Sequence, residues 1–376
     1  MNIVGVNLTW LVPGIVGGSE EYSVRLLDGI AEQGCSDLRL RLYGRAEFFD
    51  RYRRLADRFE TVVIPGRPSK LRRVLLEQTW LAEAAQGDDL LHHMGGTMPV
   101  RRQRSQRSVV TIHDLQPIEF PENFGTVKRL WLGRMIPRSI ALADLVVCPS
   151  RFTTDRIVTL LGTDRSQLRV VPHGYLSVGE EVTPTPSPAL EARLAGQRFL
   201  LYPAIAYRHK RHRHLLPVLS GLPDSLADVQ LVLTGGPGPE SDALRAEIAR
   251  SGLEAKVHVL GRVPAPDLEW LYSQALAMVF PSHYEGFGNP CLEAMGRNCV
   301  VIAADAASLP EVVGSAGLLI PPGDIRSWIR AITNVANDKA LACDLRERGH
   351  HRARWFTVAM ASSRLLAVYR ELLGSR

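Results

Sequence analysis

Residues 283–295 constrain the fold most, because they join an apolar run to a helix-like segment through a glycine-rich loop. The preceding run, Ala277–Phe280, is typical of a buried strand. Pro290 suits the first turn of a helix, and Asn289 suits the N-cap in front of it. We therefore predict a strand, a loop and a helix in that order.

This loop has the chemistry of an anion site. Gly286 and Gly288 allow the backbone to approach a ligand closely. We expect the N–H groups of Cys291, Leu292 and Glu293 to point out of the helix N-terminus, an arrangement that favours a phosphate.

Two carboxylates, Glu285 and Glu293, frame the predicted anion site. A carboxylate accepts hydrogen bonds from vicinal hydroxyls, such as those of a sugar ring or a ribose. Alternatively, Glu293 only complements the helix dipole and Glu285 is a solvated loop residue. The spacing alone leaves both interpretations open.

The loop resembles a known motif. Glu285 and Glu293, with Gly286-Phe287-Gly288 between them, resemble the E-x7-E motif of the retaining glycosyltransferases of family 4, and the resemblance continues through residues 304–313 and 316–320. It implies that Glu285 contacts the donor sugar and Glu293 the nucleotide ribose. It also implies that the donor is bound by the following loop and first-turn residues: Gly286, Phe287, Gly288, Asn289, Cys291, Leu292 and Glu293.

The length of 376 residues predicts two domains, and alternating strand-like and helix-like runs predict α/β structure with parallel sheets. The resemblance implies the GT-B fold, in which two doubly wound Rossmann-like domains face each other across a cleft. We expect an acceptor-binding domain over residues 1–178, a Pro/Thr/Ser-rich linker over 179–196 and a nucleotide-sugar-binding domain over 197–356. The resemblance implies that the C-terminal helix, residues 357–376, packs back on the first domain.

Two features of the first domain are candidates for the site. Gly17 and Gly18 join a strand over residues 2–8 to a helix that Ser19 is expected to cap; they form either a simple turn or a phosphate cradle. His113 follows an apolar run and is either structural or part of a site at the carboxyl end of a strand. The resemblance implies that Gly17 and Gly18 lie against the donor diphosphate or the acceptor, and that His113 contacts the donor sugar. We interpret Asp114 as a residue that orients His113 or its loop.

A cationic cluster that includes Arg208 and Lys210 follows the strand predicted at residues 199–202. It is either a basic surface turn or the group that neutralises a diphosphate leaving group. The resemblance implies that Lys210 contacts the donor phosphates. The family frequently has an arginine where this chain has Ala204, so either Arg208 substitutes for it or one contact is missing. Residues 296–299, Gly-Arg-Asn-Cys, also depart from the family pattern.

We expect no cofactor and no metal. The five cysteines are scattered without a Cys-x-x-Cys pair, and the histidine spacing matches no ligand set. The chain opens on a strand-like run and has no apolar run near the ~20 residues that span a bilayer. We therefore expect a cytoplasmic protein, or one that is peripheral on the inner face of the membrane.

About +5 of the formal net charge of +6 lies before Tyr175. Basic residues gather in three clusters there: Arg51, Arg53 and Arg54; Arg67, Lys70, Arg72 and Arg73; Arg101, Arg102, Arg104 and Arg107. Such clusters attract anionic lipid, or they are only a solvated surface. We predict an amphipathic helix over residues 69–85 whose basic end touches an anionic membrane. No recognition motif indicates a nucleic-acid partner.

The resulting hypothesis is a retaining, metal-independent glycosyltransferase with His113, Lys210 and Glu285 as catalytic residues. It would move a hexose from a nucleoside-diphosphate sugar to a hydroxyl of a glycan, lipid-linked or small-molecule acceptor. The Arg-His-Lys run at residues 208–210 resembles mannosyltransferases of bacterial surface polysaccharides and favours GDP-mannose. The alternatives are another GT-B enzyme, such as a sugar-nucleotide epimerase or a glycogen synthase-like transferase, and a non-catalytic nucleotide-sugar-binding scaffold for another transferase.

Overall fold

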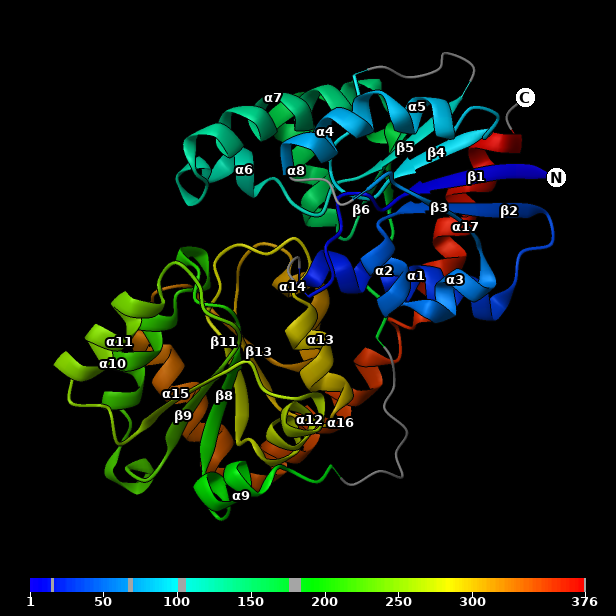
Figure 1. Cartoon of the computed structure of the whole chain (residues 1–376). Helices are drawn as coiled ribbons and strands as arrows, with labels where there is room; N and C mark the ends of the chain where they lie inside the picture. Colours follow the sequence, from blue (N-terminus) through cyan, green and yellow to red (C-terminus); the bar gives the residue numbers. More distant parts are fainter. Residues whose placement is uncertain (15–16, 67–69, 101–105, 176–183, 375–376) are drawn as a thin grey trace. The chain divides into compact units, whose positions relative to one another are not determined.

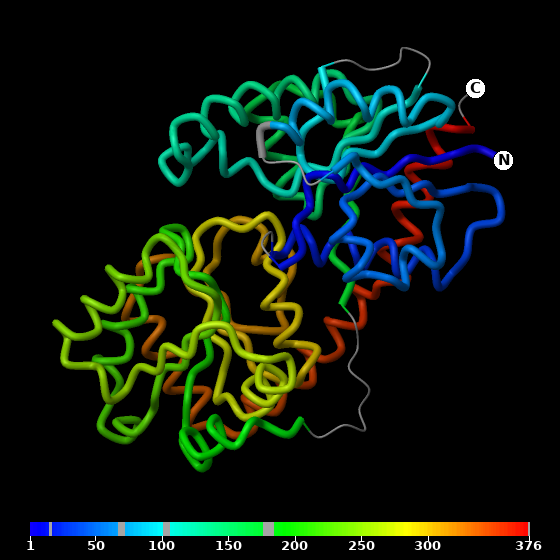
Figure 2. Tube along the Cα trace, viewed as in Figure 1, coloured from blue at the N-terminus to red at the C-terminus, as the bar shows by residue number. Residues whose placement is uncertain are grey.

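The structure is a computed structural model that describes residues 1–14, 17–66, 70–100, 106–175 and 184–374. It divides into two compact units. The first comprises Met1–Gly174 together with Phe356–Arg376, and the second comprises Tyr175–Trp355. The colours of Figures 1 and 2 show that the last helix, at the red end of the chain, lies among the blue elements of the first unit.

The first unit contains a seven-stranded parallel sheet in the order β3-β2-β1-β4-β5-β6-β7. Val4 of β1 lies opposite Leu40 on one side and Leu90 on the other. The strands are β1 (Asn2–Asn7), β2 (Leu38–Gly44), β3 (Glu60–Val63), β4 (Leu90–His93), β5 (Arg107–Thr111), β6 (Leu145–Cys148) and β7 (Leu168–Val170). The helices are α1 (Gly18–Gln33), α2 (Ala46–Arg51), α3 (Arg53–Arg58), α4 (Lys70–Gln78), α5 (Trp80–Ala84), α6 (Gln116–Glu119), α7 (Thr126–Leu142), α8 (Arg151–Leu161) and α17 (Val358–Gly374).

Helices cover both faces of this sheet. Successive residues of a strand point to opposite faces, so Val109 packs in one core cluster with residues of α1 and α17, and Val110 packs in another with residues of α7 and α8. Figure 1 shows these two groups of helices on opposite sides of the sheet. Helix α17 packs closely on α1 at Gly29, where a Cβ atom would lie 2.3 Å from Oγ of Ser362.

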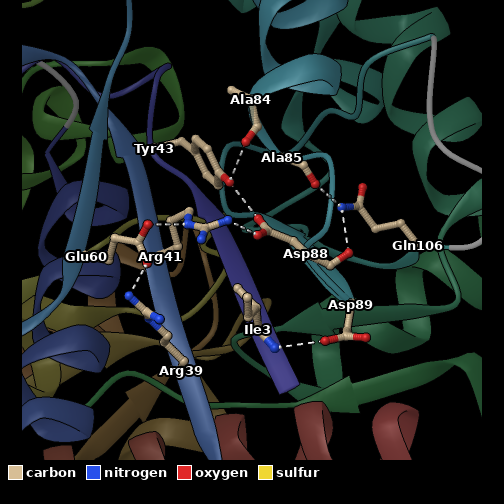
Figure 3. A network of polar contacts seen from close by, with 10 residues as sticks. All are labelled: Ile3, Arg39, Arg41, Tyr43, Glu60, Ala84, Ala85, Asp88, Asp89 and Gln106. Atoms are coloured by element: carbon tan, nitrogen blue, oxygen red, sulfur yellow. Dashed lines mark hydrogen bonds and ion pairs between the residues drawn. The ribbon is translucent and has the colours of Figure 1, made fainter. Parts of the chain in front are cut away.

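A polar network ties together strands β1, β2 and β3 and the turn that enters β4 (Figure 3). Arg41 pairs with Glu60 at 2.8 Å and with the buried Asp88 at 2.5 Å. The hydroxyl of Tyr43 also donates to Asp88, at 2.7 Å, and burial raises the pKa of that carboxyl. Asp88 precedes β4 and Glu60 begins β3, so the two carboxylates of the network come from the amino ends of their strands, opposite the carboxyl ends where ligands bind.

The second unit contains a six-stranded parallel sheet in the order β10-β9-β8-β11-β12-β13. The strands are β8 (Phe199–Pro203), β9 (Gln230–Thr234), β10 (Val257–Gly261), β11 (Ala277–Phe280), β12 (Val301–Ala304) and β13 (Leu318–Ile320). The helices are α9 (Pro188–Leu194), α10 (Leu215–Ser220), α11 (Ser241–Arg250), α12 (Ala265–Gln274), α13 (Asn289–Gly296), α14 (Leu309–Val313), α15 (Ile325–Asn337) and α16 (Lys339–Ala353). The expected pair of parallel α/β sheets is thus confirmed.

Several local predictions were wrong. The helix expected over residues 69–85 is two helices, α4 and α5, interrupted at Thr79, whose hydroxyl donates to the carbonyl of Leu75 instead of capping α5. The N-cap of α1 is Gly17, not Ser19, which lies inside the helix. Residues 188–194, inside the predicted linker, form α9, because Leu190 and Leu194 are buried there.

Within the described residues, no helix is both long and apolar enough to cross a bilayer. Arg67, Arg101, Arg102 and Arg104 of the basic clusters lie outside the described residues.

Candidate functional site

The loop between β11 and α13 has the predicted strand–loop–helix form, but its helix begins differently. The N-cap is Gly288, with φ of 101°, so Asn289 is the first helical residue and not the cap. Pro290 lies in the first turn as predicted. A side chain at position 288 would be strained by this φ and would also lie 2.6 Å from Leu309.

This earlier start changes which N–H groups are available. The N–H of Cys291 donates to the carbonyl of Gly288 at 3.0 Å, so the expectation that it is free is wrong. In a helix that begins at Asn289, the N–H groups of Leu292 and Glu293 are directed to carbonyls four residues back. The three N–H groups predicted to point at an anion are thus directed into the helix, and the helix dipole still favours an anion at this end of α13.

The structure brings Lys210 and Glu285 together from two loops. Nζ of Lys210 lies 2.6 Å from Oε1 of Glu285, and the two side chains are only 16% and 12% exposed. The same ammonium lies 5.1 Å from the ring centroid of Phe280, and the hydroxyl of Tyr202 donates to the backbone carbonyl of Lys210 at 2.6 Å. An ammonium and a carboxylate held at the carboxyl ends of β8 and β11 can bind a phosphate and a sugar hydroxyl side by side.

Two buried serines that the sequence analysis missed hold the backbone of these loops. Oγ of Ser308 lies 2.9 Å from the carbonyl oxygen of Glu285 and 2.8 Å from that of Phe287. Oγ of Ser282 lies 3.3 Å from the carbonyl oxygen of His209, which also accepts the N–H of His283 at 3.1 Å. Ser308 lies within residues 304–313, and the family resemblance of that segment is the sequence feature that could have indicated its role.

The second glutamate of the motif is held by its own helix. Nδ2 of Asn289 donates to Oε1 of Glu293 at 2.7 Å. The pair spans one helical turn, so Asn289 orients the carboxylate rather than capping the helix.

The histidines beside Lys210 are neutral at pH 7. Burial lowers the pKa of His209 and of His212 to about 4. Positive charge at this turn therefore comes from Lys210 and the arginines, of which Arg208 is exposed. Among the described residues, no cluster of three or more His, Cys, Asp or Glu side chains has a geometry that could hold a metal ion.

In the first unit, Gly17 has φ of 73°, and among the described residues no atom outside the neighbouring chain lies within 4 Å of the position of a Cβ on Gly17 or Gly18. Next to them, the carboxylate of Glu20 accepts the N–H of Gly14 at 2.9 Å and the hydroxyl of Tyr52 at 2.7 Å. Glu20 and Tyr52, which the sequence did not indicate, thus hold the backbone at Gly14.

His113 follows β5, at the carboxyl end of the first sheet. Its Nε2 lies 2.9 Å from the carbonyl oxygen of Met94, a contact that requires the proton on Nε2. Burial lowers its pKa to about 4, and Tyr22 contacts the ring edge-on at 5.3 Å between centroids. Nδ1 is left as an acceptor. Asp114 accepts the N–H of Gln116 at 2.9 Å and so orients the loop.

His92 and His93 of β4 are held by contacts within the first unit. His92 bonds to Tyr369 at 2.7 Å and to Thr111 at 2.8 Å, whereas His93 bonds to Asn7 at 3.3 Å.

Comparison with known families and proteins agrees with this arrangement. The family model for glycosyl transferases group 1 matches residues 190–352, and the model for glycosyltransferase family 4 matches residues 16–175. The two matches follow one another along the chain, one in each unit.

Curated relatives carry mannosyltransferase names. O-antigen chain mannosyltransferase B of Escherichia coli is 30% identical over 274 residues, which cover 72% of this chain and 71% of the relative. O-antigen chain mannosyltransferase RfbU of Salmonella typhimurium is 26% identical over 333 residues, which cover 85% of this chain and 87% of the relative.

Solved structures show the same fold. Sucrose-phosphate synthase from Thermosynechococcus elongatus superimposes with a TM-score of 0.77 at 20% identity over 100% of both chains. Anabaena HepE in complex with UDP and glucose gives a TM-score of 0.75 at 20% identity over 99% of this chain and 100% of HepE. The chain therefore belongs to glycosyltransferase family 4, and it is a GT-B glycosyltransferase similar to bacterial mannosyltransferases.

Proposed function

We propose that this enzyme transfers mannose, with retention of anomeric configuration, from GDP-mannose to a hydroxyl of a growing or lipid-linked cell-surface glycan. The observation that carries the proposal is the Lys210–Glu285 pair at the entrance to α13, which supplies a cation and a hydroxyl acceptor 2.6 Å apart. The names of the O-antigen mannosyltransferases to which the chain is similar support mannose as the transferred sugar.

The proposed reaction breaks the bond between the anomeric carbon and the diphosphate oxygen. Lys210, the dipole of α13 and the exposed Arg208 stabilise the negative charge that builds on the departing diphosphate. Glu285 accepts hydrogen bonds from sugar hydroxyls, and Glu293 binds the ribose. The neutral His113 contributes a hydrogen-bond acceptor to the donor sugar.

The acceptor oxygen forms the new bond on the face from which the diphosphate leaves, and its proton passes to the departing phosphate oxygen. This sequence needs no covalent carboxylate intermediate, and it gives retention. Because Lys210 supplies the counter-charge, we propose that the reaction proceeds without a divalent cation.

Donor binding is tested by the thermal stability of the full chain with GDP-, UDP-, dTDP- and ADP-sugars, each with and without EDTA. A donor at about 100 times its Kd adds ~2.7 kcal/mol to the free energy of unfolding. We expect stabilisation by GDP-mannose that EDTA leaves unchanged, followed by EDTA-resistant turnover with an isolated glycan acceptor. NMR of the product should then show the α anomer, as in the donor.

Three results would contradict parts of the proposal. Stabilisation by another nucleotide class alone would replace GDP-mannose as the donor. Loss of turnover in EDTA, restored by a divalent cation, would overturn metal independence. Donor binding without turnover on any glycan acceptor would favour the scaffold alternative.

A further inference from the structure

Arg297, one of the residues that depart from the family pattern, uses its guanidinium for several contacts at the end of α13. Its guanidinium makes a two-pronged ion pair with Glu269 of α12. Nη1 also donates to the backbone carbonyl of Glu293 at 3.1 Å, one turn back in α13. The side chain is only 14% exposed, so these contacts are made largely out of water.

Two tyrosine rings stack on the same guanidinium. Its central carbon lies 5.5 Å from the ring centroid of Tyr175 and 5.2 Å from that of Tyr272. An arginine is attracted to an aromatic face, most strongly where water is excluded. A lysine has no planar guanidinium, so it cannot pair with Glu269, donate to Glu293 and lie against both rings at the same time.

The neighbouring glycine shows how closely Tyr175 approaches. A Cβ atom on Gly296 would lie 2.3 Å from the Tyr175 ring, so only glycine fits at the last position of α13. Tyr175 is the first residue of the second unit. The chain therefore enters this unit at a tyrosine that is clamped on the end of α13.

The contact of Arg297 with the backbone carbonyl holds Glu293 on the side opposite its carboxylate. The last carbonyls of a helix lack partners within the helix, and Arg297 bonds one of them at Glu293. A cation at this end also complements the helix dipole. At the same time Asn289 holds the carboxylate of Glu293 at 2.7 Å. The backbone and the side chain of Glu293 are thus each held by a specific partner.

We propose that Arg297 is a positioning residue for Glu293, which it holds in the orientation that binds the ribose hydroxyls of the donor nucleotide. The inference rests on the proposed function, in which Glu293 is the ribose ligand. Arg297 itself touches no substrate; Glu269, Tyr175 and Tyr272 are the frame that holds it.

The test is a double-mutant cycle read by direct binding of GDP and by donor kinetics. We expect Arg297→Ala to weaken GDP binding and raise the KM for the donor about tenfold, with kcat within about threefold of wild type, since the sugar-side groups are unchanged. Glu293→Ala should produce a similar loss. In the Glu293→Ala background, Arg297→Ala should add less than about twofold, because two residues that act through one contact are not additive.

Two further variants guard against a general loss of structure. Arg297→Lys keeps the charge and should lose about threefold in GDP affinity, which decides the question if Arg297→Ala does not fold. Arg245→Ala removes an exposed arginine of α11 and should leave both binding and kinetics unchanged.

The outcomes separate the two proposals. Failure of the wild-type protein to bind any nucleoside diphosphate would overturn the proposed function and this inference with it. Normal wild-type binding with fully additive losses in the double variant, or with an unchanged donor KM in a folded Arg297→Ala protein, would overturn the role of Arg297 alone.

Discussion

At the scale of single residues, the Lys210–Glu285 pair determines what the second unit can do. Both side chains are mostly buried, so each charge depends on the other for compensation. A phosphate oxygen that approaches Lys210 would replace part of this compensation, and a sugar hydroxyl would donate to Glu285. The pair therefore suits a ligand in which a phosphate lies next to sugar hydroxyls.

Replacing Glu285 tests this interpretation. Glu285→Gln keeps the shape but leaves Lys210 without its counter-charge and weakens the hydroxyl acceptor. We expect turnover to fall at least about tenfold, which corresponds to about 1.4 kcal/mol of barrier. Steady-state kinetics of a variant with a native-like melting curve provides the measurement.

The matched control is Glu240→Gln, which removes one carboxylate partner of the half-exposed Arg213 in the same unit. Its turnover should stay within about twofold of wild type. Near-normal turnover of Glu285→Gln would remove Glu285 from the reaction.

At the scale of elements, buried and half-buried histidines lie at or just past the ends of strands of the first sheet. His92 and His93 end β4, His113 follows β5, and His173 follows β7. Burial lowers the pKa of His92 and His93 to about 3 and that of His113 to about 4, and it lowers that of His173 well below the usual value. All four are therefore neutral in the folded unit at pH 7.

These pKa values predict loss of stability in acid. The unfolded chain, whose histidines titrate near pH 6.5, binds protons before the folded chain does. Stability is therefore fully present above about pH 6.5 and falls as the pH drops towards the folded pKa values, about 4 for His113 and about 3 for His92 and His93. At pH 5 each of His92 and His93 should cost ~2 kcal/mol. Urea unfolding of the full chain at pH 7.5 and pH 5, followed by probes specific to the first unit, measures this loss.

A substitution identifies the residues responsible. His92→Gln cannot titrate in this range, so the loss between pH 7.5 and pH 5 should shrink by about 2 kcal/mol. His351→Gln, at an exposed position of α16, should leave the loss unchanged. An identical loss in wild type and His92→Gln would refute the assignment.

At the scale of the whole molecule, the two ends of the chain build the first unit, and most of the positive charge lies in that part of the sequence. Helix α7, with Lys128, Arg129, Arg134 and Arg138, contains no acidic residue. Val127 and Leu130 of the same helix are 81% and 51% exposed. Exposed apolar and basic side chains on one helix favour contact with an anionic lipid surface.

Cosedimentation with vesicles tests the predicted membrane contact. We expect the protein to bind vesicles that contain anionic lipid at low salt and to bind neutral vesicles much less, because each basic side chain near the surface contributes about 1 kcal/mol. Lys128→Gln with Arg129→Gln, at exposed positions of α7, should reduce binding several-fold, and Arg72→Gln tests the helix for which the contact was first predicted. Arg245→Gln in the second unit should not reduce binding, and equally poor binding to both kinds of vesicle would contradict the prediction.

The sequence predicted the parts of this protein that depend on local pattern. Apolar runs between glycine and proline signals located the parallel strands, and the spacing of Glu285 and Glu293 with the motif after it identified the family. Ser150, a preferred N-cap residue type directly before α8, caps that helix, with Oγ accepting the N–H of Thr153 at 3.1 Å. Each of these signals lies within a few residues of the feature it predicts.

Only the tertiary structure decided the contacts between distant segments. The Lys210–Glu285 pair, the contacts of Ser308 with the loop and the contacts of Arg297 with Glu269 and the two tyrosines join residues separated by 21 to 122 positions. The tertiary fold also moved the start of α13 to Asn289, because Gly288 could adopt a positive φ against Leu309. Sequence pattern determines which segments become strands and helices, whereas the partners of a side chain depend on which segments the sheet order brings together.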